Sequence, residues 1–269
     1  MTDMFAIIRS ELTKIVTLPS VWIVTVILLA LSLLFQYQGM AVTKEVLETL
    51  DANGMHWWYG RPVDAELDQF ATMGAVIFNP GIFFPLLGAV IAGAEFRTGQ
   101  LGLSVLAVPS RTRLVIGKTI ATALYALITG FTFIIMTIFS TYLAVKDWQP
   151  DLIWRSEALT QMVGGVLFIV AITLITFGIT LITRRTLFGI VVMGGFIGVT
   201  LTQVIASFIP DLDALTPISA ARNLLLQNDT GIQAAPFSSS PEIGALVLIG
   251  WVLLAFIVSM ITVQRRDAR

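Results

Sequence analysis

Six stretches of the sequence contain no charged residue, and each is long enough to cross a lipid bilayer as a helix. The hydrocarbon core of a bilayer is about 30 Å thick, which takes roughly 20 apolar helical residues. Helices of a soluble domain need a polar face, whereas these stretches are apolar nearly all round. The charge-free stretches are 15–43, 70–94, 119–145, 158–183, 186–210 and 243–264. They predict an all-α integral membrane protein that crosses the membrane six times.

The composition supports the same class of protein. Charged residues make up 12% of the chain and the mean hydropathy is +0.88, whereas an ordinary soluble domain is about 25% charged. We expect one transmembrane domain over residues 1–269 with no appended soluble domain. The expected spans are 20–41, 70–94, 117–143, 160–183, 187–209 and 243–263.

Lysine and arginine are divided unequally between the two sides of the expected bundle. An even number of spans places both termini on one side, which then carries 11 Lys/Arg and 4 acidic residues. The other side carries 5 Lys/Arg and 13 acidic residues. A surplus of Lys and Arg in short loops marks the cytoplasmic side. We therefore expect a multi-pass protein of the cytoplasmic (inner or plasma) membrane with both termini in the cytoplasm.

A short amphipathic helix is expected before the first span, over residues 3–18. Apolar residues such as Met4 and Leu12 recur there at helical spacing, and we assign Glu11 and Lys14 to the polar side. Such a helix lies in the membrane interface. An ordinary polar lead-in to the first span is the alternative.

A second short helix is expected between the fifth and sixth spans. Pro217 opens a stretch, 217–227, with apolar residues at helical spacing, and proline suits the first turn of a helix. The segment 215–235 is either external or partly re-entrant.

The residues inside the spans exclude several classes of membrane protein. None of the six stretches contains an ionisable side chain, which argues against a self-energised pump or a channel lined by charged rings. With His56 as the only histidine and no cysteine, we expect no metal site. Gly117-Lys118-Thr119 is a poor nucleotide site because Thr112 stands where a phosphate-binding loop needs glycine. We therefore expect a chain that is not itself an enzyme, with no cofactor and no nucleic-acid partner.

Neutral polar and small residues mark two helix faces. Hydroxyl side chains on one face of the fourth span, with a glutamine in the fifth, form either a packing face or a translocation surface. These residues are Thr173, Thr176, Thr180 and Gln203. Gly194 and Gly198 make a small-xxx-small pattern that permits close helix approach, and they are a possible dimer contact.

The loop after the second span carries a set of short motifs. Glu95 through Leu101 read Glu-Phe-Arg-Thr-Gly-Gln-Leu, Pro109 and Arg111 follow, and Lys118 enters the third span. This loop resembles the corresponding loop of ABC-2 type permeases, the membrane subunits of type V ABC exporters. The segment from Arg9 to Lys14 resembles the interfacial N-terminal helix of the same family, and the six-span layout matches.

The resemblance implies a function and partners. The loop would form a coupling helix docked on a separate ATPase subunit that uses ATP and Mg, and two permease chains, identical or similar, would pair in the lipid membrane. The implied coupling residues are Glu95, Phe96, Arg97, Gly99, Arg111 and Arg113. The complex would export an amphipathic or apolar substrate. From the sequence alone, Glu95 can equally be a solvated charge at a helix end.

Two other classes of function remain open from the sequence. One is a secondary transporter or channel that uses only neutral polar groups. The other is a membrane scaffold or immunity protein that binds a partner without transport. An ATPase that copurifies with the chain would separate the exporter from both.

Overall fold

The computed structural model describes residues 4–58, 60–97, 110–226 and 237–265, except the side chains of residues 58 and 97. Its helices are α1 (Met4–Thr17), α2 (Pro19–Glu48), α3 (Ala65–Gly81), α4 (Pro85–Arg97), α6 (Arg111–Val145), α7 (Ser156–Thr183), α8 (Thr186–Thr202), α9 (Val204–Phe208), α10 (Pro210–Ala214), α11 (Pro217–Leu225) and α12 (Pro241–Arg265). A 3-10 turn, η1 (Pro150–Trp154), and a hairpin of β1 (Met55–Trp58) and β2 (Arg61–Asp64) complete the described elements.

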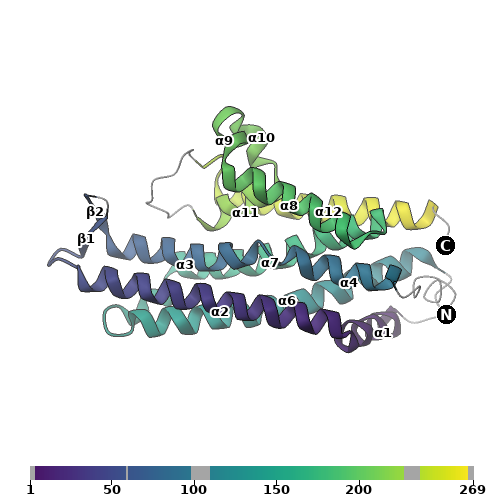
Figure 1. Ribbon diagram of the computed structural model, residues 1–269, viewed down its shortest axis with the longest axis horizontal. Helices are drawn as coiled ribbons and strands as arrows, with labels where there is room; N and C mark the ends of the chain where they lie inside the picture. The colour runs from purple at the N-terminus through teal and green to yellow at the C-terminus, as the bar shows by residue number, and fades with distance from the viewer. Residues whose placement is uncertain (1–3, 59, 98–109, 227–236, 266–269) are drawn as a thin grey trace.

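The long helices lie side by side along one axis, as in a membrane-spanning bundle (Figure 1). Within the described residues, five helical stretches are long and apolar enough to cross a membrane: α2, α3 with α4, α6, α7 and α12. The expectation of an all-α, multi-pass membrane protein is confirmed at this level.

The expected span over 187–209 is not one continuous helix. Helix α8 covers only 17 residues, about 25 Å at 1.5 Å per residue, and this falls short of a hydrocarbon core of about 30 Å. It ends at Gln203, whose φ of 54° lies in the left-handed region that stops a helix. The chain continues as α9 and α10, which stand out from the bundle (Figure 1). The charge-free apolar run continues across the break, so hydropathy alone could not locate it.

Helix α7 is the centre of the bundle. It packs against α3, α4, α6, α8, α11 and α12, and 72% of its most apolar window is buried, compared with 22% for α12. Phe168 of α7 stacks on Phe78 of α3 with 5.7 Å between ring centroids. Gly88 brings α4 close, because a Cβ there would lie 2.1 Å from the carbonyl oxygen of Thr173. Tight packing of this kind drives helix association in membranes, where lipid is as apolar as leucine.

The second expected span is interrupted near its middle. Helix α3 begins at its N-cap Asp64, whose carboxylate accepts hydrogen bonds from two backbone N–H groups of the first turn. It ends at Gly81, one residue after Pro80, and α4 begins at Pro85. Proline cannot donate to the helical ladder, so the break falls where the prolines stand.

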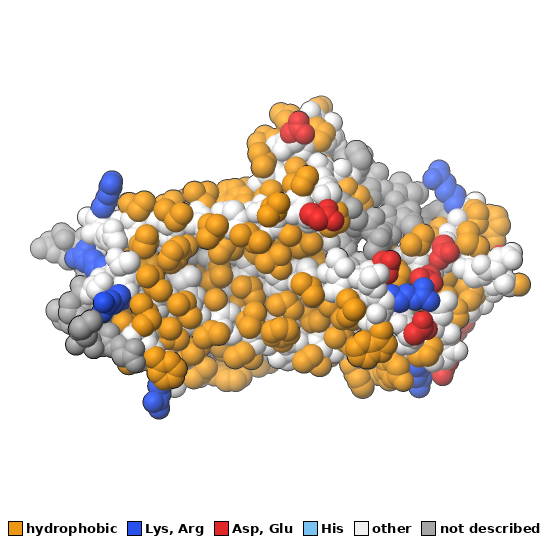
Figure 2. All heavy atoms as spheres, turned by 180° about the vertical axis from the view of Figure 1, so that it is seen from behind, with side chains coloured by type: hydrophobic (Ala, Val, Ile, Leu, Met, Phe, Trp, Pro, Cys, Tyr) orange, Lys and Arg blue, Asp and Glu red, His pale blue; other side chains and the backbone are white. Residues whose placement is uncertain are grey.

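The two ends of the bundle differ in charge. Helices α1, α4 and α12 bring both described chain ends, and the start of α6, to one end, while the β-hairpin lies at the other (Figure 1). The face in Figure 2 is apolar between a basic end and an end where acidic and basic side chains gather. The structure therefore places both described chain ends, at residues 4 and 265, at the same end of the bundle.

Helices lie at both positions where the sequence predicts a short helix outside the spans. Helix α1 packs along the start of α6. Helix α11 is buried over its whole length, between α12, α7, α3 and α8. It is thus part of the bundle rather than an exposed external segment.

Candidate functional site

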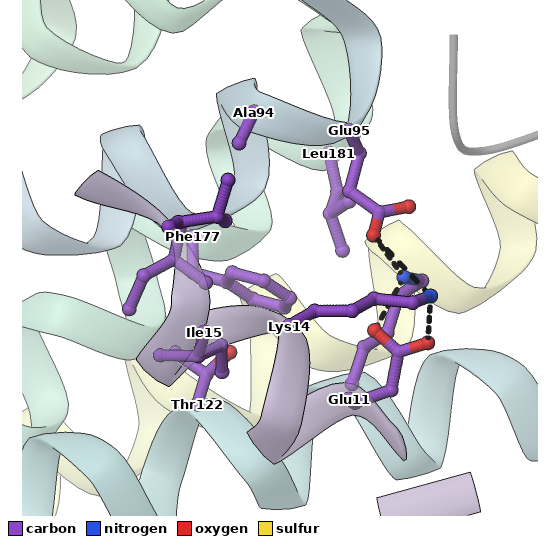
Figure 3. Close-up of a pocket in the computed structure, with 11 residues that line it drawn as sticks. Glu11, Lys14, Ile15, Ala94, Glu95, Thr122, Phe177 and Leu181 are labelled. Atoms are coloured by element: carbon purple, nitrogen blue, oxygen red, sulfur yellow. Dashed lines mark hydrogen bonds and ion pairs between the residues drawn. The ribbon is translucent and has the colours of Figure 1, made fainter. Parts of the chain in front are cut away.

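Four charged side chains form a buried cluster at the end of the bundle that holds the chain ends. Lys118 Nζ of α6 lies 2.7 Å from Glu11 Oε2 of α1 and 2.6 Å from Glu95 Oε1 of α4. Lys14 Nζ lies 2.7 Å from Glu11 Oε1 and 3.9 Å from Glu95 Oε1. Figure 3 shows Glu95 and Glu11 approaching the two ammonium groups from different helices. We call these four residues the ion-pair cluster.

Helix α1 places Glu11 in the cluster because Glu11 lies on its buried stripe. Ile7, Glu11 and Ile15 follow one another at intervals of four residues and are the buried residues of α1. The assignment of Glu11 to the polar face was therefore wrong. Counting in steps of four from Ile7 would have identified an acid among apolar neighbours, which needs a partner when buried.

Gly117 allows α1 to lie against α6. A Cβ at this position would be 2.5 Å from Ile7 Cγ2, so any larger residue would push α1 away. Leu114 and Ile7 form a small separate apolar cluster one turn earlier. The segment that superficially resembled a phosphate-binding loop is thus helical and serves helix packing, and Lys118 is held in ion pairs.

The ion-pair cluster is electrically balanced, with two carboxylates and two ammonium groups. The side chains of Lys118, Glu11 and Glu95 are 4%, 8% and 9% exposed, and that of Lys14 is 31% exposed. Removing one partner from such a buried pair leaves an uncompensated charge, which typically costs about 3–5 kcal/mol. Each charge therefore depends on the others.

One oxygen of the cluster is unpaired within the described part of the chain. Glu95 Oε2 is buried without a hydrogen-bond partner there, as is Thr122 Oγ1. Both residues line a cavity of about 20 Å³ between α1, α4, α6 and α7 (Figure 3). A space of this size holds about one water molecule, and two polar groups give it partners.

Glu95 lies two residues before the end of α4, where the basic loop begins. Its burial excludes the reading of a solvated helix-end charge. Phe96 is half-buried and packs on the main apolar core, and Arg97 is the last residue of α4. Gly99 and the rest of 98–109 lie outside the described residues.

The loop's other implied coupling residues lie at the start of α6. Arg111 Nη1 donates to the carbonyl oxygens of Val263 and Gln264, at 3.2 Å each, and so satisfies acceptors at the C-terminal end of α12. Gln264 Nε2 also donates to Thr112 Oγ1 at 2.8 Å. Arg113 is exposed. The structure thus brings Arg111 to the end of α12, not into the ion-pair cluster.

The hydroxyl face of the fourth span is enclosed within the bundle. Thr173, Thr176 and Thr180 are each fully buried. Gly189 packs α8 against Thr180, since a Cβ there would lie 2.2 Å from its Oγ1. Gln203 is half-buried at the end of α8 and does not join this face. The three threonine side chains are thus enclosed by neighbouring helices.

The glycines of α8 are placed differently from the threonines. Gly194 and Gly198 are exposed, and an added Cβ at either would meet no atom within 4 Å. They leave a smooth helix surface free for another helix.

A second buried ion pair lies in the α10–α11 region and was not anticipated from the sequence. Asp213 Oδ2 accepts from Arg222 Nη2 at 3.0 Å and from Ser238 Oγ at 2.8 Å, and Oδ1 accepts from Ser219 Oγ at 2.7 Å. Asn223 Nδ2 also donates to Ser238 Oγ at 2.9 Å. Burial lowers the pKa of Arg222, which the ion pair with Asp213 opposes.

The Asp213–Arg222 pair has no signature in the sequence. Its two residues stand in segments that hydropathy assigns to an aqueous loop, where charges are ordinary. The return of α11 into the bundle buries them together. The pair fixes α10, α11 and residue 238 to one another.

The fold and these two clusters define a multi-pass helical membrane protein with two groups of buried charges. One group joins α1, α4 and α6 at the end of the bundle with the described chain ends, and the other joins α10 and α11. Compared with known proteins, the sequence matches no family model and no curated protein.

Proposed function

We propose that this chain is the membrane subunit of an ABC exporter of the ABC-2 type. The observation that carries the proposal is the ion-pair cluster, which joins the amphipathic helix α1, the start of α6 and the last turns of α4. The resemblance of the loop that follows α4 to a coupling loop adds to it. The six-span arrangement proposed here counts α8 with α9 as the fifth, interrupted crossing.

The cluster suggests how motion would pass into the membrane. A partner ATPase that displaces the loop after α4 would pull on Glu95, and Glu95 is bound to Lys118 of α6. Lys118 is in turn bound to Glu11 of α1, so the three helices would move together. The chain itself supplies no nucleotide chemistry in this scheme, and ATP and Mg would be held by the partner.

The proposed assembly contains two permease chains and two ATPase subunits in the cytoplasmic membrane. Both chain ends and the basic loop face the cytoplasm in this assembly, in agreement with the positive-inside rule. The exposed glycine surface of α8 is the proposed contact between the chains. The cargo is an amphipathic or apolar molecule.

The test begins with copurification. The full chain is extracted from its native membrane in detergent, and copurifying ATPases are identified by mass spectrometry. The complex is then reconstituted in proteoliposomes, and its ATPase rate is compared with that of the ATPase subunit alone. We expect stimulation by the wild-type chain, and the absence of any copurifying ATPase would reject the proposal in favour of a secondary transporter or scaffold.

Glu95→Gln and Glu45→Gln form a matched pair for the coupling role. Glu45 is exposed near the C-terminal end of α2, away from the end of α2 that follows α1. Its replacement should therefore leave the stimulation of the ATPase intact. Glu95→Gln removes a buried charge and should cut stimulation several-fold, since a broken buried pair costs about 2–5 kcal/mol. Binding of the ATPase, measured by copurification, separates lost coupling from lost assembly. Equal stimulation by both variants would refute the coupling role.

A further inference from the structure

A groove opens on the surface of the bundle between α2 and α3. It measures about 370 Å³, and its lining includes Gly39 of α2 with Ala71 and Ala75 of α3. Ala71 and Ala75 stand four residues apart and so lie on one face of α3. Small residues let a neighbouring helix approach closely in a membrane. The groove is therefore suited to receive a further helix.

Three neutral polar side chains also line the groove. Gln38 of α2 is exposed, and Thr72 and Asn79 of α3 are half-buried. No hydrogen bond joins any of these three side chains to another group in the described part of the chain. Asn79 lies near the middle of the apolar stretch Ala65–Phe96, where lipid tails offer no hydrogen bond. The groove therefore calls for an occupant that brings polar groups of its own.

Helix α8 carries a surface that matches the groove. Gly194, Gly195 and Gly198 are exposed, and a Cβ added at any of them would meet no atom within 4 Å. Thr202 follows one turn after Gly198 and is also exposed. Its hydroxyl donates to the carbonyl oxygen of Gly198 at 2.9 Å, which leaves the lone pairs of the hydroxyl oxygen able to accept a hydrogen bond. The surface thus combines a narrow helix with a hydrogen-bond acceptor.

The two surfaces lie at matching heights along the bundle. Gly93 of α4 and Thr186 of α8 are in contact, since a Cβ at residue 93 would overlap the Thr186 side chain. Measured from this contact, Asn79 lies about 21 Å along the second span, and Gly198 and Thr202 lie about 18 Å and about 24 Å along α8. A two-fold axis along the membrane normal preserves such heights. It therefore brings Asn79 of one copy level with Thr202 of another.

Both surfaces are reachable from one side of the molecule. Helix α4 packs against α2 and against α8, so it lies between them. Figure 1 shows α2, α3 with α4, and α8 in this succession across one face of the bundle. One copy can thus insert its α8 into a second copy and receive the second copy's α8 in return. Such an exchange is closed by two-fold symmetry and leaves no surface open for further copies.

We propose that α8 of a second copy of this chain docks in the groove between α2 and α3. Asn79 Nδ2 donates to Oγ1 of the partner's Thr202, and the same contact occurs twice around the axis. The inference rests on the pairing of two chains in the proposed function and deepens it, because it names the surface that α8 meets. It differs from a symmetrical contact of α8 with the partner's α8. Association is measured without any ATPase subunit.

Cross-linking between two copies tests the contact directly, because the chain has no cysteine of its own. Two differently tagged copies are coexpressed, one with Ala75→Cys and the other with Thr202→Cys, and a short linker that reacts with thiols is added to the membranes. We expect a cross-linked pair that carries both tags. Two copies that both carry Thr202→Cys should remain separate. Leu246→Cys, at a residue of α12 that is 67% exposed, is the control and should not link to Thr202→Cys.

A double-mutant cycle tests the hydrogen bond between Asn79 and the partner's Thr202. Asn79→Leu should lower the dimerisation constant about eightfold, because the two-fold dimer loses two interhelical hydrogen bonds. Thr202→Val should have the same effect, and the double variant should lose no more than either single variant. Thr132→Val is the matched control, since this exposed hydroxyl of α6 bonds to its own helix at the carbonyl of Ile128. The dimeric fraction is measured by single-molecule photobleaching in liposomes over a range of protein-to-lipid ratios.

The outcomes separate this proposal from the pairing of chains and from export. Cross-linking of two Thr202→Cys copies to each other, without a link to Ala75→Cys, overturns the docking of α8 in the groove and leaves the dimer standing. The absence of both links overturns the proposal, as do additive losses in the double variant. Unchanged thermal unfolding of each variant shows that a lost dimer reflects the contact and not the fold. The copurification test of export is unaffected by any of these results.

Discussion

Lys118 Nζ of α6 lies 2.6 Å from Glu95 Oε1 of α4, and both side chains are more than nine-tenths buried. Glu11 of α1 binds the same ammonium group at 2.7 Å. A buried charge is stable only when paired, so α1 is tied at one point to α4 and α6, which lie much later in the sequence. This point lies at the end of the bundle from which the basic loop departs.

Replacing Lys118 with Met should destabilise the protein more than any exposed charge change. The variant leaves Glu11 and Glu95 facing each other with only Lys14 for compensation, and we expect a loss of about 3–5 kcal/mol in the free energy of unfolding. Unfolding in detergent by increasing denaturant gives the value. Lys44→Met, at an exposed ion pair in α2, is the matched control and should stay within about 0.5 kcal/mol of the wild type. Similar losses in both would mean that the cluster contributes little.

Asp213 and Asp211 provide a matched pair within α10. Asp213→Asn removes the charge that compensates buried Arg222, whereas Asp211 is exposed. We expect Asp213→Asn to cost about 3–5 kcal/mol and to free the α10–α11 region, and Asp211→Asn to change little. Proteolysis after residue 222 in nanodiscs reports local opening. Protection of both variants to the same degree as the wild type would contradict the structural role of the pair.

The topology can be tested with single cysteines, since the chain has none of its own. Ser110 is exposed at the end of the bundle with the chain ends, and Ala52 is exposed next to the β-hairpin at the other end. In whole cells, an impermeant thiol reagent should label Ala52→Cys and not Ser110→Cys. Disruption of the membrane should then expose both. Labelling of Ser110→Cys alone in intact cells would reverse the orientation.

Self-association through α8 can be tested without disturbing the fold. Gly198 has open space around it, so Gly198→Leu should leave thermal unfolding unchanged and lower the dimeric fraction measured by single-molecule photobleaching in nanodiscs. Gly178 is the contrasting case, because a Cβ there would lie 2.9 Å from Ala255 Cβ. Gly178→Leu should therefore destabilise the bundle itself. A wild-type chain that is monomeric in nanodiscs would rule out this contact.

The sequence by itself determined the class of protein, an all-α protein that crosses a membrane several times. Several charge-free stretches of at least 20 residues indicate membrane spans. In a bilayer, apart from a closed barrel, only a helix makes all its backbone hydrogen bonds within the segment. The sequence also predicts a short helix before the first span and another after Pro217, because apolar spacing and proline are local signals, and α1 and α11 lie at these positions.

Tertiary structure alone decided where the buried charges meet and where the fifth stretch breaks. Glu11, Glu95 and Lys118 are joined by helix packing across about 100 residues of sequence, and hydropathy carries no information on such pairs. Gln203 looks like one polar residue in an apolar run, yet it turns the chain so that α11 can return and bury Asp213 with Arg222. The physical reason is that the burial of a given side chain depends on which helices pack together in the folded protein. The local sequence pattern shows only which segments are apolar.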